Sequence, residues 1–267
     1  MTKPLSGRIA LVTGASRGIG RAVAIGLAKQ GAHVVAVART QGALEELDDA
    51  IRSAGGEAAT LVPIDLRDAD ALDRLGAAIY ERWGKLDIFI GNGGTLGPIT
   101  PLGHVTPKEW DQVMAVNVTA NWRLIRSFDP LLQKSDAGRV VLLSSGASWK
   151  RLAYWGPYSV SKSAVDALGV TYAHETQNTP IKVMLVNPGP IRTDMRAAAM
   201  PGEDPMTLET PEDLAPHILA MASPDWTISG QIYDHPSKKV LSSSFRPEFE
   251  SLLFFTLVAV GIIGISQ

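Results

Sequence analysis

The chain has 267 residues and a net charge of −2, from 25 lysines and arginines against 27 aspartates and glutamates. Hydrophobic residues make up 45% of it, which excludes a disordered chain. No basic excess points to nucleic acid. The absence of cysteine excludes thiol catalysis, cysteine-based zinc sites and disulfides, and we expect no metal site. The N-terminal residues lack the apolar segment of a secretory signal, so we expect a cytoplasmic protein.

Apolar runs alternate with segments of helical periodicity along most of the chain. The runs expected to form strands cover residues 8–13, 33–38, 58–64, 86–90, 139–143 and 181–186. The expected helices cover residues 19–30, 43–53, 69–83, 107–114, 118–133, 158–176 and 214–222. Several runs are continuously apolar, as in strands that are covered on both faces. This alternation predicts an α/β fold: a single doubly wound parallel β-sheet with helices on both faces.

We expect this domain to occupy residues 1–241 and an apolar C-terminal tail to occupy residues 242–267. The stretch from Leu252 to Ile265 reads LLFFTLVAVGIIGI and carries no charge. It is shorter than the roughly 18–20 residues that a helix needs to span a bilayer. We interpret the tail as packing on the domain or at a subunit interface. Membrane association and an altered C-terminus are the alternatives.

A glycine-rich turn, TGASRGIG at residues 13–20, joins the first expected strand to the first helix. Gly14 permits the tight turn, Gly18 lets the backbone approach a pyrophosphate, and Gly20 lets the helix pack closely on the sheet. The helix N-terminus offers N–H groups and a partial positive charge to phosphates. Its position between a strand and a helix predicts a dinucleotide site. An ordinary glycine-rich turn is the alternative.

A tyrosine and a lysine lie four residues apart in the helix expected at 158–176. Tyr158 and Lys162 therefore share one helix face. An ammonium at that position favours the phenolate and lowers the tyrosine pKa from its ordinary value of about 10. Ser145 lies at the end of the fifth expected strand. We interpret the three residues as a candidate catalytic group, with a core aromatic as the alternative for Tyr158.

The G-x-x-x-G-x-G spacing of the turn, followed in order by Ser145, Tyr158 and Lys162, resembles the short-chain dehydrogenase/reductase family over roughly residues 5–235. The 3-oxoacyl-carrier-protein-reductase-like members are the most similar. The resemblance implies a Rossmann-like fold and hydride transfer between NADP(H) and a carbonyl or secondary alcohol. Ser145 would bind the carbonyl oxygen, Tyr158 would donate the proton, and Lys162 would hold the nicotinamide ribose. The resemblance adds Asn117, whose backbone carbonyl would hold a water beside the lysine; a structural asparagine is the alternative.

Two arginines favour NADP(H) over NAD(H). The second expected strand ends at Arg39, where an acidic residue would hold the 2′-hydroxyl of NAD and a cation suits the 2′-phosphate of NADP. Arg17, in the glycine turn, reaches the same phosphate. In family members with a similar pattern, these two positions go with NADP(H). Exposed surface arginines are the alternative.

The resemblance also implies the other cofactor contacts. Asp65 matches the acid that contacts the adenine, with a helix N-cap as the alternative role. The loop at residues 187–193 resembles the one that walls the nicotinamide, where Gly189 leaves room for the ring and Thr193 bonds the carboxamide. The full candidate cofactor set is Gly14, Ser16, Arg17, Gly18, Ile19, Gly20, Arg39, Asp65, Leu66, Asn92, Gly93, Tyr158, Lys162, Pro188, Gly189, Ile191 and Thr193.

The segment after the fourth expected strand departs from the family pattern. Family members usually carry Asn-Asn-Ala-Gly there, whereas this chain has Gly-Asn-Gly-Gly at residues 91–94. We expect a looser loop beside the adenine ribose without loss of binding. Gly91 is therefore left out of the candidate set.

Residues on the substrate side are less specific. We expect some of three aromatic side chains to line a pocket, with packing under the loop as the alternative: Trp149, Tyr154 and Trp155. Lys150 and Arg151 fit a solvated pair better than a site for an anionic carrier. Residues 194–209 have the composition of a short substrate lid.

The function favoured by these patterns is an NADP(H)-dependent oxidoreductase acting on a small-molecule carbonyl or alcohol. A non-catalytic nicotinamide-nucleotide-binding regulator is one alternative, although the intact Ser145–Tyr158–Lys162 set argues against it. A membrane-associated reductase anchored by the apolar tail is another. The resemblance implies a homodimer or homotetramer formed through the helices expected at 118–133 and 158–176.

Overall fold

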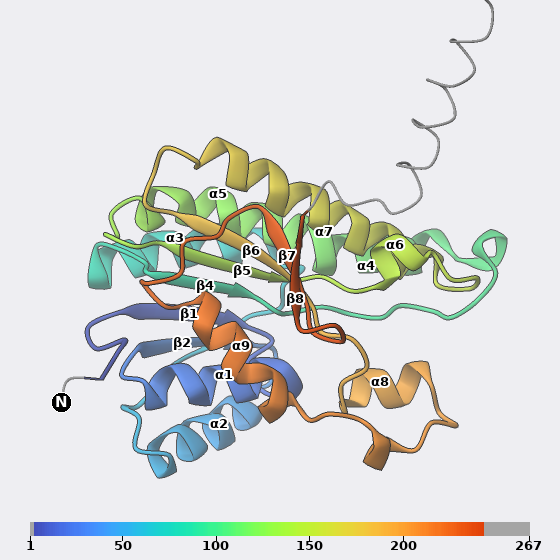
Figure 1. Ribbon diagram of the computed structural model, residues 1–267, viewed down its shortest axis with the longest axis horizontal. Coiled ribbons are helices and arrows are strands. Elements are labelled where there is room, and N and C mark those ends of the chain that lie inside the picture. Colours follow the sequence, from blue (N-terminus) through green and yellow to red (C-terminus); the bar gives the residue numbers. More distant parts are fainter. Residues whose placement is uncertain (1–2, 243–267) are drawn as a thin grey trace, which may run out of the picture.

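The computed structural model describes residues 3–242. Of the tail predicted at 242–267, Ser242 is the last residue of a strand and the rest lies outside the described residues. Within 3–242 the strands form one sheet in the order β3-β2-β1-β4-β5-β6-β7-β8 (Figure 1). The strands are β1 (Ile9–Thr13), β2 (His33–Ala38), β3 (Thr60–Pro63), β4 (Ile88–Gly91), β5 (Arg139–Leu143), β6 (Lys182–Asn187), β7 (Gln231–Asp234) and β8 (Lys239–Ser242). Neighbouring strands from β3 to β7 are parallel, and β8 is antiparallel to β7.

Helices cover both faces of this sheet. The α-helices are α1 (Gly18–Lys29), α2 (Gln41–Ser53), α3 (Ala69–Trp83), α4 (Pro107–Met114), α5 (Ala120–Leu132), α6 (Ala147–Lys150), α7 (Gly156–Glu175), α8 (Asp194–Ala199) and α9 (Pro211–Met221). Short 3-10 turns η1 (Leu102–His104) and η3 (Pro205–Thr207) and a π-helical segment η2 (Ala115–Thr119) complete them. In Figure 1, α1, α2 and α9 lie on one side of the sheet and α3, α5 and α7 on the other. The predicted doubly wound fold is confirmed.

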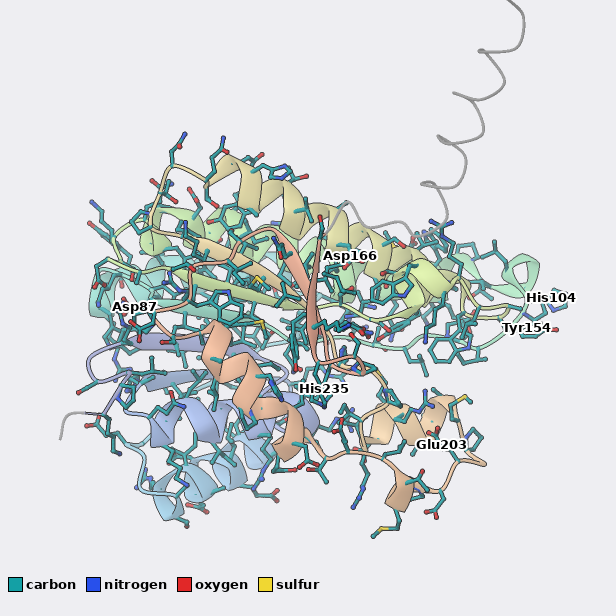
Figure 2. The ribbon with its side chains drawn as sticks, in the orientation of Figure 1. Asp87, His104, Tyr154, Asp166, Glu203 and His235 are labelled. Atoms are coloured by element: carbon teal, nitrogen blue, oxygen red, sulfur yellow. The ribbon has the colours of Figure 1, made fainter. Side chains whose placement is uncertain are left out.

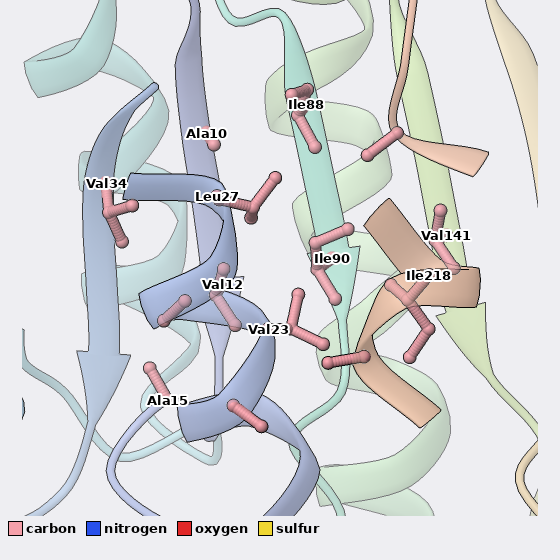
Figure 3. Packing of buried hydrophobic residues seen from close by; sticks show 14 of the residues in the cluster. Ala10, Val12, Ala15, Val23, Leu27, Val34, Ile88, Ile90, Val141 and Ile218 are labelled. Carbon is pink, nitrogen blue, oxygen red and sulfur yellow. The ribbon is translucent and has the colours of Figure 1, made fainter. Parts of the chain in front are cut away.

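Burial on both faces explains the continuously apolar strands. Along β1, Ala10 and Val12 pack with residues of α1, α2 and α9 in one core cluster, whereas Leu11 belongs to the cluster formed with α3, α5 and α7. Figure 3 shows the first cluster around Val12 and Val23. In the second, the rings of Phe89 and Phe128 meet edge to face at 5.3 Å. Because both faces are covered, no polar alternation is needed.

Sequence patterns did not predict the last two strands. β7 and β8 form a hairpin of two four-residue strands, QIYD and KVLS, at one edge of the sheet. Both are too short and too polar for a clear periodicity. They add an antiparallel strand to the parallel sheet that was predicted. In the part of the chain that the structure describes, no helix is long and apolar enough to cross a membrane.

The strand order brings several loops together at one edge of the sheet. β1 lies between β2 and β4, so the connections that follow β1 and β4 leave the sheet in opposite directions. In sheets of this kind, ligands bind in the crevice at the carboxyl ends of the strands, where the order reverses. The glycine turn after β1 and the loops after β4, β5 and β6 all begin at this edge.

Candidate active site

A cleft of about 800 Å³ opens at the carboxyl ends of the strands. It contains nearly all of the residues predicted from the sequence: Gly14, Ser16, Arg17, Gly18, Ile19, Arg39, Asp65, Leu66, Asn92, Gly93, Ser145, Tyr158, Lys162, Pro188, Gly189, Ile191 and Thr193. Gly20 and Asn117 do not line it. Within residues 3–242 the structure has no cluster of three or more side chains suited to a metal ion.

The glycine turn has the backbone geometry that its spacing predicts. Gly14 and Gly18 have φ angles of +63° and +53°, in the left-handed region that favours glycine. A Cβ at position 14 would also lie 2.9 Å from the side-chain nitrogen of Asn92. In the described part of the chain no side chain caps the N-terminus of α1, which starts at Gly18. Its first amides therefore face the cleft as candidate phosphate donors.

Gly20 lies behind the turn and not in the cleft. A Cβ there would come within 2.3 Å of the Gly14 carbonyl oxygen and 2.4 Å of the Asn92 side-chain nitrogen. Asn92 Nδ2 donates to the carbonyls of Thr13, at 2.9 Å, and Gly14, at 3.2 Å. Gly20 thus makes room for α1 against the β1 turn.

Two arginines lie near Asp65 in the part of the cleft that follows β2 and β3. Arg39 follows β2 as predicted, and the sequence reasoning missed Arg67. The Arg67 guanidinium binds Asp65 through Nε–Oδ1 and Nη2–Oδ2 contacts of 3.1 and 2.7 Å and lowers the pKa of that carboxyl. Asp65 is not the helix cap, since Asp68 accepts from the first turn of α3. Only the position of Arg67 two residues after Asp65 could have indicated it.

Arg17 contacts the segment that was predicted to form a lid. Its exposed guanidinium lies 3.1 Å from a carboxylate oxygen of Asp194, the first residue of α8. Because both side chains are about three-quarters exposed, this ion pair is weak. The Arg17 guanidinium lines the cleft, and an anion that binds it more strongly than Asp194 does would replace Asp194 as its partner.

Ser145, Tyr158 and Lys162 come together on the other side of the cleft. Ser145 follows β5, and the other two residues share one face of α7, as the spacing predicts. Lys162 Nζ donates to the carbonyl of Leu143, at 2.6 Å, and lies 5.7 Å from the centre of the Tyr158 ring. The Ser145 hydroxyl hydrogen-bonds that of Tyr158. Both the phenol and the ammonium are buried.

The expectation that Lys162 lowers the tyrosine pKa is wrong for this structure. Burial raises the pKa of Tyr158, and the hydrogen bond from Ser145 opposes that increase only in part. Burial also lowers the pKa of Lys162 to about 8, against the field of Asp166, which raises it. The ammonium is directed at the carbonyl of Leu143 and desolvation dominates both groups.

Asn117 lies behind the cleft, in the π-helical segment η2. Its side chain accepts from the Thr95 amide, at 2.8 Å, and donates to the Thr95 carbonyl and to Ser161 Oγ, both at 2.9 Å. Its backbone carbonyl accepts from Asn121 Nδ2, at 2.7 Å. The water implied by the resemblance at this carbonyl stays a prediction. π-Helical turns are frequent at functional sites, and this one ties α5 to the loop after β4.

The loop after β6 differs in detail from the expectation. Gly189 has φ +69°, but a Cβ there would strike Pro236 of the β7–β8 turn at 2.5 Å. The room that Gly189 provides is therefore needed by this hairpin. Thr193 lines the cleft and caps α8 by accepting from the Arg196 amide. Asn187, which the sequence reasoning did not select, accepts from the Gly146 amide at 2.7 Å and so ties this loop to the one after β5.

Apolar side chains form the walls next to Ser145 and Tyr158. Of the three aromatic residues proposed, Trp155 lines the cleft, while Trp149 and Tyr154 are exposed and lie outside it. Figure 2 shows Tyr154 at a tip of the molecule, far from α8. Lys150 and Arg151 also lie outside the cleft. The lid predicted at 194–209 contains α8, and both apolar and charged residues of this helix line the cleft: Asp194, Met195, Arg196, Ala198 and Ala199.

The surroundings of Gly91 explain why this chain has glycine there, where the family pattern has asparagine. A Cβ at this position would lie 2.6 Å from both Asn121 Oδ1 and a methyl carbon of Leu142. The Asn121 side chain thus fills the space that a residue larger than glycine would need. Gly91 does not line the cleft.

A glycine turn at the strand-order reversal of a doubly wound sheet, sharing one cleft with a Ser–Tyr–Lys group, defines a dinucleotide-binding α/β protein. The family model for short chain dehydrogenases matches residues 8–204. The chain therefore belongs to the short-chain dehydrogenase family, as the sequence resemblance implied.

Relatives support the same assignment. The oxidoreductase YciK of Escherichia coli (strain K12) is 38% identical over 223 residues, which cover 83% of this chain and 88% of YciK. A short chain dehydrogenase from Shigella flexneri 2a, complexed with NADP, has a TM-score of 0.84 at 35% identity and covers 88% of this chain and 99% of its own. One from Escherichia coli CFT073, complexed with NADPH, has a TM-score of 0.83 at 36% identity and covers 88% and 98%. The NADP and NADPH in these two complexes agree with the cofactor that the sequence predicts.

Proposed function

We propose that this protein is an NADP(H)-dependent oxidoreductase that interconverts a carbonyl compound and its alcohol. The observation that carries the proposal is that Ser145, Tyr158 and Lys162 face the same cleft as the glycine turn. NADP(H) supplies or accepts the hydride when bound. Ser145 and Tyr158 then hold the carbonyl oxygen through their hydroxyls, where charge develops in the transition state. Lys162 orients the ribose and the phenol.

The protonation states suit reduction of a carbonyl. Because burial raises its pKa, Tyr158 stays protonated at neutral pH and has a proton to donate. Lys162, with a pKa of about 8, is mostly cationic at neutral pH and loses its charge as the pH rises through that value. Reduction is therefore expected to decline above about pH 8. Oxidation of the alcohol needs the phenolate and is favoured at higher pH.

The cleft fits NADP(H) at its other end. Arg17 and Arg39 offer guanidinium groups for a 2′-phosphate, and the α1 N-terminus offers backbone amides for a pyrophosphate. Asp65, held by Arg67, supports the adenine. The NADP and NADPH complexes of the structural neighbours support the same choice.

The walls near Tyr158 favour an uncharged substrate with an apolar flank. Trp155, whose ring is 5.9 Å from that of Tyr158, lines the cleft, and α8 adds the apolar side chains of Met195, Ala198 and Ala199 to its lining. The nearby Arg196 pairs with Glu203, at 2.6 Å, and is thereby neutralised. Burying apolar groups against these walls is worth roughly 0.8 kcal/mol per CH₂. We infer that larger apolar ketones and aldehydes bind better than charged 2-oxo acids.

The test is NADPH oxidation with a panel of ketones and aldehydes. Tyr158→Phe removes the hydroxyl that donates the proton, so its turnover should fall by at least about a hundredfold. Tyr154→Phe is the matched control, because that phenol is exposed and outside the cleft. Equal turnover in the two variants would refute the role of Tyr158. NADPH binding without turnover of any substrate would favour the non-catalytic regulator.

Self-association and cellular location stay predictions. We propose a homodimer or homotetramer formed through α5 and α7. Trp122 on α5 is 45% exposed, which supports a covered face there. Light scattering that found only a particle of 28.5 kDa would refute the proposal. The cytoplasmic location expected from the sequence is a further prediction.

A further inference from the structure

Beneath the candidate catalytic residues lies a buried acid that the proposed mechanism does not use. Asp166 follows Lys162 by one turn on α7, so the two side chains share a helix face. Figure 2 places Asp166 inside the molecule, close to α7. Its Oδ1 is buried and finds no hydrogen-bond partner at close range among residues 3–242. A buried carboxylate is expensive unless it interacts with donors or a cation.

The groups next to this carboxylate come from the loop that carries Ser145. The hydroxyls of Ser144 and Ser148 approach Asp166 and, as donors, lower its pKa. Both hydroxyl oxygens are buried, and neither makes a hydrogen bond of ordinary length and angle in the described part of the chain. They flank Ser145 in sequence, and the Ser148 amide donates to the Ser145 carbonyl at 3.0 Å. Two serine hydroxyls on either side of Ser145 are thus available to this one acid.

A second contact ties the same loop to the same helix. Ser163, next to Lys162 on α7, donates through Oγ to the Ser148 carbonyl at 2.8 Å. Lys162 Nζ donates to the carbonyl of Leu143, directly before Ser144. The α7 helix therefore holds both ends of the turn at residues 143–148, and the carboxylate of Asp166 faces the turn between those contacts.

We propose that Asp166 is a positioning residue for the Ser145–Tyr158–Lys162 site: its carboxylate faces the buried hydroxyls of Ser144 and Ser148, on both sides of Ser145, and places a negative charge one helical turn from the Lys162 ammonium. The proposal rests on the proposed function, because it assigns Asp166 to the same site. Asp166 does not line the cleft.

The charges around the pair are few. Within residues 3–242, Asp166 is the one charged group that raises the pKa of Lys162, and Lys162 is the one cation that lowers the pKa of Asp166. The packed elements contribute the hydroxyls of Ser144 and Ser148 and the phenol of Tyr158. Lys150 of α6 is exposed to solvent. The field at Lys162 therefore depends mainly on this one carboxylate.

Removing the charge has effects of opposite sign on activity and stability. Burial is the larger effect on Asp166 and raises its pKa above the ordinary 3.8. The unfolded chain ionises this group without that penalty, so the ionised carboxylate destabilises the fold at neutral and higher pH. Asp166→Asn is expected to keep or raise the melting temperature at pH 8 while it impairs turnover. A residue that served stability alone would lower the melting temperature when replaced.

The test compares Asp166→Asn with Glu175→Gln, which removes a charge from an exposed position of the same helix. For Asp166→Asn we expect kcat to fall about tenfold, with the KM for NADPH little changed. Its alkaline limb should move to lower pH by roughly half a unit to one unit, because Lys162 loses the field that keeps it charged. Glu175→Gln should match the wild type. A kcat and alkaline limb for Asp166→Asn equal to those of Glu175→Gln would overturn the proposal.

A second measurement decides the proposal independently of turnover. In protein labelled with ¹³C-lysine, the Lys162 NMR signal, assigned by its loss in Lys162→Met, should titrate near pH 8 in the wild type. In Asp166→Asn it should titrate at lower pH. An unshifted titration would overturn the proposal. If the wild type reduced no carbonyl compound, the proposed function would fail, and this titration would still show whether Asp166 acts on Lys162.

Discussion

Replacing Gly20 by alanine tests whether α1 meets the turn after β1 as closely as the glycine spacing implies. The added Cβ would lie 2.3 Å from the Gly14 carbonyl oxygen and 2.4 Å from Asn92 Nδ2. Neither atom is the end of a long flexible chain. Either α1 must move away from the sheet, or the Gly14 carbonyl must shift and Asn92 must give up its bonds to the carbonyls of Thr13 and Gly14.

The size of the effect follows from these contacts. Overpacking of this kind costs roughly 1–3 kcal/mol, and each lost hydrogen bond of Asn92 adds roughly 0.5–1.5 kcal/mol. Alanine favours the helix by about 1 kcal/mol over glycine, which offsets part of the loss. We expect the free energy of unfolding to fall by about 1–5 kcal/mol. Gly42→Ala in α2 is the control, because nothing lies within 4 Å of its Cβ; it should be neutral or slightly stabilising.

Urea unfolding followed by circular dichroism measures both variants, and quenching of protein fluorescence gives the dissociation constant for NADPH. Gly20→Ala should lose stability and bind NADPH more weakly, because the turn is displaced. Equal unfolding midpoints for Gly20→Ala and Gly42→Ala would show that the close approach of α1 is not needed. The account of the glycine turn would then be wrong.

Three further predictions concern the cofactor, the substrate and pH. Arg39→Ala should raise the dissociation constant for NADPH by about 10–100-fold, as expected for losing a charge-assisted phosphate contact. The dissociation constant for NADH should rise much less. The control Arg52→Ala, on the exposed side of α2, should change neither constant. Trp155→Ala should lower kcat/KM for apolar ketones about tenfold or more, whereas Trp149→Ala should not; equal effects would refute the apolar wall. Burial lowers the pKa of His235 below the ordinary 6.5. As the pH falls through 6.5, this histidine therefore takes up a proton in the unfolded chain before it does so in the folded protein. The stability that the neutral His235 contributes is complete above pH 6.5 and is lost as the pH falls. His235→Gln should flatten the decline in unfolding free energy between pH 7 and about 5, and an unchanged slope would contradict this.

The sequence predicted the elements that are long, apolar and strongly patterned. Four elements have the predicted boundaries: β2, β5, α3 and α4. Strong local signals set one end of each helix, because Gly84 ends α3 and the Thr106–Glu109 capping box begins α4. Several candidate site residues that follow a buried strand do line the cleft. The turn after β1 and Ser145 after β5 reach the same cleft because parallel strands end at one edge of the sheet.

What the sequence did not predict depends on contacts between distant segments. Arg67 carries no motif, and only the folded chain shows its bond to Asp65. The room at Gly189 is needed by Pro236, in a hairpin too short to show a periodicity. The pKa of Tyr158 depends on how deeply α7 buries the phenol, and spacing alone could not show that desolvation outweighs the nearby ammonium.

The central claim is that a carbonyl carbon receives hydride in this cleft while Tyr158 supplies the proton. NADPH that carries deuterium at the transferring position, incubated with the wild type and an apolar ketone, tests it directly by mass spectrometry of the alcohol. We predict one deuterium on the carbinol carbon and a loss of this product in Tyr158→Phe but not in Tyr154→Phe. An alcohol without deuterium, or the same yield from Tyr158→Phe as from the wild type, would contradict the account.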